Sequence, residues 1–153
     1  MLNLNNRGFT LIELMVVIFI IAILSTVILL SLDSARKDAR DSQRIADMQA
    51  VIGAQNLYYS HNNYFFTDNG TSGIPNISGY LTASSDPGEG TYIWKDNTSC
   101  NPNGEYFCVY ITLEVAADEC EFNTYKAVSE KGIETICETS QGAGFTGTGC
   151  DCW

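Results

Sequence analysis

Residues 9–32, FTLIELMVVIFIIAILSTVILLSL, form an almost uninterrupted apolar run that decides the fold of the amino-terminal part of the chain. Nineteen of these 24 residues are apolar, and Glu13 is the only charged one. As a helix, the run would be roughly 36 Å long, enough to cross a bilayer core of about 30 Å. A lone strand could not do so, because its backbone groups would lack partners in lipid. The sequence therefore predicts a transmembrane helix over 9–32.

A short polar leader, residues 1–8, precedes this run and carries one basic residue, Arg7. In a secretory signal peptide, the cleavage site follows the apolar run and has an Ala-x-Ala-like pattern. Here the run ends in Leu-Leu-Ser-Leu-Asp over 29–33, and the better small-residue site is Gly8, ahead of the run. Cleavage after Gly8 would remove the leader and leave the membrane helix on the mature protein.

Glu13 is unusual because an isolated carboxylate in hydrocarbon is strongly unfavourable. It lies four residues after Phe9, one helical turn from the amino terminus that cleavage would create. The terminal amine of Phe9, from the same chain or from a neighbouring one, would neutralise this carboxylate. The alternative is a side chain near the helix end that reaches the lipid headgroups. That alternative explains neither the Gly8–Phe9 junction nor the spacing.

Residues 8–14, Gly-Phe-Thr-Leu-Ile-Glu-Leu, followed by the apolar run, resemble the class III signal of type IV pilins and type II secretion pseudopilins. In that signal, Gly precedes the cut, Phe follows it, and Glu lies five residues into the mature chain. The resemblance implies cleavage after Gly8 by a prepilin peptidase and N-methylation of Phe9. It also implies that Glu13 pairs with the terminal amine of an adjacent subunit in a helical filament.

This resemblance is close over residues 7–32 and weaker as far as about Tyr64. Many family members have Gly and Pro, associated with a melted helix segment, where this chain has Ala22 and Leu30. The implied partners are further copies or related pilins, the prepilin peptidase and methyltransferase, and an inner-membrane assembly platform. The implied orientation has a cytoplasmic amino terminus and an extracytoplasmic head, with the filament periplasmic or at the cell surface. The count of basic residues favours the opposite orientation, because one lies before the apolar run and four follow it in residues 33–59, and the more basic side of a membrane helix usually faces the cytoplasm.

Residues 33–59 are predicted to continue the helix, because apolar and aromatic residues recur at three- and four-residue spacing from Ile45 to Tyr59. The stretch has four basic and four acidic residues and no net charge. Two interpretations are compatible here: a solvated surface with weak ion pairs, or charge matching between filament subunits. The charged residues are Asp33, Arg36, Lys37, Asp38, Arg40, Asp41, Arg44 and Asp47.

Residues 60–153 are predicted to form an α+β head, in which a sheet packs on the outer half of the long helix. The stretch 60–91 is rich in Asn, Ser, Gly and Pro and predicts a long loop, which the aromatic residues 64–66 anchor on the helix. Short strands are predicted over 92–94, 106–113, 125–129 and 133–136, the last two joined by a hairpin turn with Gly132. This gives three or four antiparallel strands, the arrangement of the pilin head.

All six cysteines lie in the head, and an even count in an exported, loop-rich region predicts three disulfides. The cysteines are Cys100, Cys108, Cys120, Cys137, Cys150 and Cys152. A turn-like segment between the first two favours the pair Cys100–Cys108, with the last two reaching back to Cys120 and Cys137. A zinc site is the rival interpretation, but the chain has no Cys-x-x-Cys and one histidine, His61.

Major pseudopilins often bind calcium in a head loop, and the best candidates here are four acidic residues whose spacing matches no EF-hand. They are Glu114, Asp118, Glu119 and Glu121. A solvated acidic face is the favoured interpretation, so no metal or other cofactor is expected. Three Asn-x-Ser/Thr sequons, at Asn69, Asn76 and Asn97, are unsurprising in an Asn-rich loop.

The charge distribution excludes some functions and leaves two main hypotheses. The whole chain has a net charge of -10, and residues 60–153 contain 13 acids and three lysines, so the acidic head is not expected to bind nucleic acid. No nucleophile–base pair or phosphate loop indicates an enzyme. The favoured hypothesis is a filament subunit, of a pilus or of a secretion pseudopilus. The alternative is a binding module with a single membrane anchor.

Overall fold

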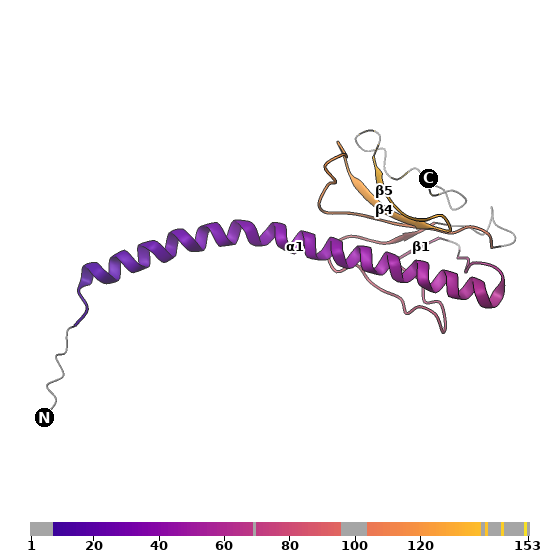
Figure 1. The fold of residues 1–153 in the computed structure, drawn as a ribbon, viewed down its shortest axis with the longest axis horizontal. Helices are drawn as coiled ribbons and strands as arrows, with labels where there is room; N and C mark the ends of the chain where they lie inside the picture. The colour runs from indigo at the N-terminus through magenta and orange to yellow at the C-terminus, as the bar shows by residue number, and fades with distance from the viewer. Residues whose placement is uncertain are drawn as a thin grey trace, which may run out of the picture. The chain divides into compact units, whose positions relative to one another are not determined.

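The computed structural model describes residues 8–68, 70–95, 104–138, 140, 145 and 152. They divide into two compact units, 1–36 and 37–153. The first unit contains the amino-terminal part of a long helix. The second contains the remainder of that helix and an antiparallel sheet (Figure 1). The α+β fold class that the sequence predicts is therefore confirmed.

Helix α1 spans Leu11–Asn62. It is unbroken because no Gly or Pro occurs between residues 9 and 52. The helix ends at Asn62, three residues beyond the expected Tyr59, and the next residue, Asn63, has a left-handed φ of 63°. Asn tolerates this conformation better than most residues, and the Asn63 N–H donates to the Tyr59 carbonyl at 2.8 Å. A left-handed residue with this bond is a common way for a helix to end.

The five-stranded sheet has the order β1-β2-β3-β4-β5, so each strand pairs antiparallel with its neighbour in the chain. The sequence predicts three or four strands, each within two residues of its observed position. The additional strand is β1, whose two residues lie in a stretch of Asn, Ser and Gly that predicts a loop. The strands are β1 Thr71–Ser72, β2 Ile93–Trp94, β3 Cys108–Thr112, β4 Thr124–Ser129 and β5 Gly132–Cys137.

The β4–β5 hairpin closes through two residues, because Ser129 pairs directly with Gly132. Gly132 has a φ of 126°, a conformation that side chains with a Cβ rarely adopt. The glycine that marks the turn in the sequence is therefore required by the backbone.

The two faces of the sheet pack against different parts of the chain. Alternate residues of β3 show the division, because Val109 and Ile111 join one buried cluster and Cys108 joins another. The first cluster includes Met48 and Val51 of α1, so this face lies on the helix. The second cluster contains Cys108, Ala127 and Cys152, with Tyr110, Ile136 and Phe145 packed against it.

Aromatic residues after the helix anchor the following loop, as the sequence predicts. Tyr58 of α1 contacts the rings of Tyr64 and Phe66 edge-on, with centroids 5.6 and 5.9 Å away. Buried Gln55 fixes the same point, because its amide both accepts from the Phe66 N–H at 2.9 Å and donates to the Phe66 carbonyl at 3.2 Å. The polar backbone of the loop is thereby satisfied where it crosses the helix.

Two disulfides join the described cysteines, and both differ from the expected pairing. Cys108 bonds Cys152, with Cα atoms 5.4 Å apart, and Cys120 bonds Cys137, with Cα atoms 5.1 Å apart. The expected pair Cys100–Cys108 is wrong, because Cys108 lies on the sheet face that the carboxyl-terminal Cys152 covers. Cys120 meets Cys137 because the β3–β4 connection ends beside the last residue of β5. The remaining two cysteines, Cys100 and Cys150, lie outside the described residues.

Candidate functional site

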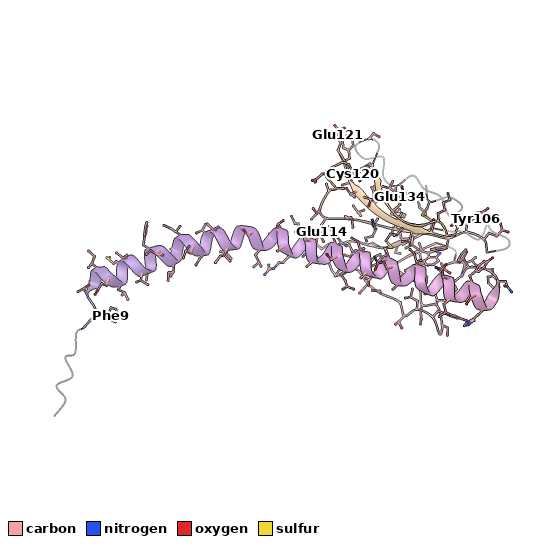
Figure 2. All side chains as sticks on the ribbon, in the orientation of Figure 1. Phe9, Tyr106, Glu114, Cys120, Glu121 and Glu134 are labelled. Carbon is pink, nitrogen blue, oxygen red and sulfur yellow. A yellow bond between two sulfur atoms is a disulfide. The ribbon has the colours of Figure 1, made fainter. Side chains whose placement is uncertain are left out.

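The Gly8–Phe9 junction lies just before α1, and both residues are exposed. The Phe9 side chain, labelled at the start of the helix in Figure 2, is 93% exposed. An exposed junction outside the helix is a substrate that a peptidase can reach, because cleavage requires access to both sides of the peptide bond.

Glu13 is held at the start of the helix by Thr10. The Thr10 N–H and the Thr10 hydroxyl both donate to Glu13 Oε2, at 2.8 and 2.7 Å. In return the Glu13 N–H donates to Thr10 Oγ1 at 3.3 Å. This is a capping box, and its Thr-x-x-Glu signature before an apolar run is visible in the sequence. In the sequence, the spacing of Glu13 from Phe9 indicates a role for the carboxylate. That Thr10 holds this carboxylate is not among the predictions made from the sequence.

The apolar part of α1 has no covering within its own unit. Every described side chain from Leu11 to Leu29 is exposed, in a helix long and apolar enough to cross a membrane. The hydroxyls of Ser25 and Thr26 donate to the carbonyls of Ile21 and Ala22, at 2.6 and 2.9 Å. These polar side chains therefore satisfy themselves on their own helix, which suits a lipid environment.

In the second unit, a buried guanidinium of α1 joins the helix to two segments of the head. The Arg44 side chain is 1% exposed, and its Nε and Nη2 donate to the two oxygens of Asp86 at 2.5 and 2.7 Å. Its Nη1 donates to Asp41 at 2.7 Å and lies 3.0 Å from Glu114 Oε1. The hydrogen bonds to Asp86 hold its pKa below the ordinary value of a carboxyl group.

Backbone amides complete this arrangement, which we call the Arg44 cluster (Arg44, Asp41, Asp86, Glu114 and Arg40). The Asp41 carboxylate accepts from the N–H groups of Glu114 and Val115, and Asp86 accepts from those of Gly88 and Gly90. The Arg40 Nε donates to Glu114 Oε1 at 2.7 Å and, with Arg44, lowers the pKa of the Glu114 carboxyl. The cluster thus ties the segments around 86–90 and 113–115 to α1.

The Arg44 cluster changes the interpretation of the charged helix stretch. Arg44 and Asp41 are neither solvated nor directed at another subunit, because both are buried against their own head. Asp47 is also engaged within the chain, since its Oδ2 accepts from the Tyr92 hydroxyl at 2.6 Å and from the Ser84 hydroxyl at 3.3 Å. The sequence predicts the helix but not which of its charges face the head.

The four calcium candidates are not gathered into one site. Glu114 pairs with Arg40 and Arg44 of α1, whereas Glu121 lies near the other end of the β3–β4 connection, next to Cys120 (Figure 2). Asp118 and Glu119 are exposed. Among the described residues, no three His, Cys, Asp or Glu side chains are grouped as metal ligands. His61, the only histidine, contacts the Tyr80 hydroxyl at 3.0 Å.

Known proteins resemble the amino-terminal part of the chain. A family model described as the prokaryotic N-terminal methylation motif matches residues 3–29. The amino terminus of this chain is therefore similar to that methylation motif. The Type IV wide pilus major component PilA4 of Thermus thermophilus is 44% identical over 61 residues, 40% of this chain and 47% of that protein. The predicted resemblance to pilins is therefore confirmed.

A second relative is the Type II secretion system core protein G of Escherichia coli. It is 35% identical over 65 residues, 42% of this chain and 45% of that protein. The chain therefore spans about half the length of the curated relatives it matches. No solved structure matches the chain. Neither relative's name describes an enzyme.

Proposed function

We propose that this chain is a structural subunit of a helical filament, either a type IV pilus or a type II secretion pseudopilus. One observation carries the proposal. A single segment combines an exposed Gly8–Phe9 junction, a carboxylate one helical turn beyond it, and a helical run, residues 11–29, whose apolar side chains are all exposed. The matched methylation motif and the two relatives support the same function.

The exposed apolar helix requires a covering in each state of the subunit, because apolar surface in water is unfavourable. Lipid covers residues 9–32 while the subunit waits in the membrane. Helices of neighbouring subunits cover them in the filament. Such packing brings the amine of each processed Phe9 to the carboxylate of a neighbouring Glu13, so that neither charge remains unpaired in an apolar environment.

The remaining parts follow from this proposal. Residues 1–8 are a cytoplasmic leader that a prepilin peptidase removes, and a methyltransferase acts on the new terminus of Phe9. The head, residues 60–153, lies outside the cytoplasm, where its disulfides are stable. An inner-membrane assembly platform then moves subunits from the bilayer into the filament.

Mass spectrometry of the mature protein tests the processing step. The expected amino-terminal residue is a methylated Phe9. An intact Met1, or a cut beyond Leu32, would contradict the proposal. Failure of a prepilin peptidase to process the chain would favour the alternative, a membrane-anchored binding module.

A matched pair of variants tests the assembly step. Glu13→Ala should abolish filaments while membrane insertion survives, because an amine in the filament core loses its partner. Ser25→Ala is the control, since the Ser25 hydroxyl is bonded within its own helix and its loss should leave assembly unchanged. Normal filaments from Glu13→Ala would refute the role of this carboxylate. Long surface fibres would identify a pilus, and short periplasmic ones a pseudopilus.

A further inference from the structure

The two oxygens of the Glu13 carboxylate have different surroundings. Oε2 accepts both donors of Thr10, whereas Oε1 accepts no hydrogen bond from the described residues. A carboxylate oxygen has two acceptor positions, so two donors satisfy Oε2 and fix the orientation of the group. Thr10 therefore leaves Oε1 as the oxygen that a further donor can reach.

An open cavity lies beside this carboxylate. It has a volume of about 370 Å³ and is lined by Phe9, Ile12, Glu13, Val16 and Val17. Glu13 supplies the only polar side chain in this lining. Apolar walls with one carboxylate complement a group that is apolar and carries one positive charge, and a terminal ammonium on phenylalanine has this chemistry.

We propose that Thr10 is the positioning residue of the assembly contact. Its hydroxyl holds Glu13 Oε2, so that Oε1 meets the terminal amine of a neighbouring copy. The inference rests on the proposed function, because the amine exists only after processing and reaches Oε1 only in a filament. A carboxylate that is already oriented loses less conformational freedom on pairing, and in a low dielectric its charge-assisted hydrogen bond to Thr10 is strong.

A helix cap is the simpler role for Thr10, and substitutions can separate the two roles. Gly is nearly as good an N-cap as Thr, but it has no hydroxyl to donate to Glu13. Ser keeps both the cap and the hydroxyl. A cap alone therefore predicts that Thr10→Gly and Thr10→Ser both assemble normally. The positioning role predicts that only Thr10→Ser does.

The experiment measures the fraction of processed full-length subunit recovered in sheared filaments, after expression in a host with a prepilin peptidase and an assembly platform. Unprocessed chain is counted separately, so an effect on cleavage does not enter the result. For Thr10→Gly we expect a loss of about tenfold, the lower end of what a hydrogen bond to a charged group contributes. Thr10→Ala should show at least the same loss. Thr10→Ser should stay within about twofold of the wild type.

The outcomes separate this inference from the proposed function. If the wild type forms no filaments although it is processed, the proposed function fails. If the wild type assembles and Thr10→Gly assembles as well or better, Thr10 does not position Glu13. Equal losses in Thr10→Gly and Thr10→Ser would also overturn the inference, because the position would then tolerate no change at all.

Discussion

Replacing Arg44 with methionine tests how the head is held on its helix. Arg44 is the cation on which the buried carboxylates of Asp41 and Asp86 converge, and their side chains are 9% and 3% exposed. Methionine has a similar length and keeps the apolar contacts of the arginine stem. The substitution therefore removes the charge and its hydrogen bonds and creates only a small cavity.

The expected loss follows from the burial of these groups. Breaking a buried ion pair by removing one partner costs about 3–5 kcal/mol, because the other charge stays buried without compensation. Arg40, one turn earlier, provides a matched control, since its side chain and that of Glu114 are 30% and 26% exposed. Such an exposed pair contributes little to stability, because water and salt screen it. We expect Arg44→Met to destabilise the head by about 3 kcal/mol more than Arg40→Met.

Urea unfolding of the full chain in detergent micelles measures both losses, followed by near-ultraviolet circular dichroism. Buried Trp94 makes the packed head visible in that signal. Equal losses for the two variants would refute the reasoning. A double variant provides a further check, because Arg44→Met with Asp86→Asn removes both charges. It should unfold at a higher urea concentration than the sum of the two single losses predicts.

Further predictions concern pH, disulfides and the helix. Folding lowers the pKa values of the Asp86 and Glu114 carboxyl groups. The free energy of unfolding that these ionised groups contribute is therefore complete at neutral pH and is lost as the pH falls through their folded-state pKa values. Urea unfolding from pH 7 to pH 3 measures this loss. Replacing both cysteines of a disulfide by serine should lower the free energy of unfolding in the same assay, and by more for the longer closed loop. The expected loss is about 3 kcal/mol for Cys120–Cys137, separated by 17 residues, and about 4 kcal/mol for Cys108–Cys152, separated by 44. Gly53→Ala should raise the free energy of unfolding by about 0.5–1 kcal/mol and so raise the urea midpoint, because alanine favours the helix and a Cβ at this position meets nothing within 4 Å.

Local sequence signals determined the helix and most of the sheet. Helix α1 forms because its apolar residues recur and no Gly or Pro interrupts them before Gly53. Strands β2 to β5 are rich in aromatic and β-branched residues and are separated by turn residues, so they are found within two residues of their predicted positions. Strand β1 was missed because two residues carry no periodic signal. It exists through its pairing with β2.

The candidate site divides in the same way. Gly8, Phe9 and Glu13 are close in the chain, so their spacing alone predicts a cut after Gly8 and a partner for the carboxylate, whereas methylation of Phe9 is implied by the resemblance to pilins. The role of Thr10 could also be predicted from the sequence, because a capping box is a local pattern of four residues. Its bond to Glu13 is evident only from the hydrogen bonds at the start of the helix.

Contacts between distant residues were decided by the tertiary structure alone. Arg44 meets Asp86 across 42 positions of the chain, and Cys108 meets Cys152 across 44. Neither pairing is encoded in a local spacing, because which partners meet depends on where the sheet places each loop. The sequence by itself determined a long helix with an apolar amino-terminal half and an acidic, cysteine-rich head. The packing of the sheet on α1 determined which charges of the helix are buried and which cysteines join, since only folding brings those groups within bonding distance.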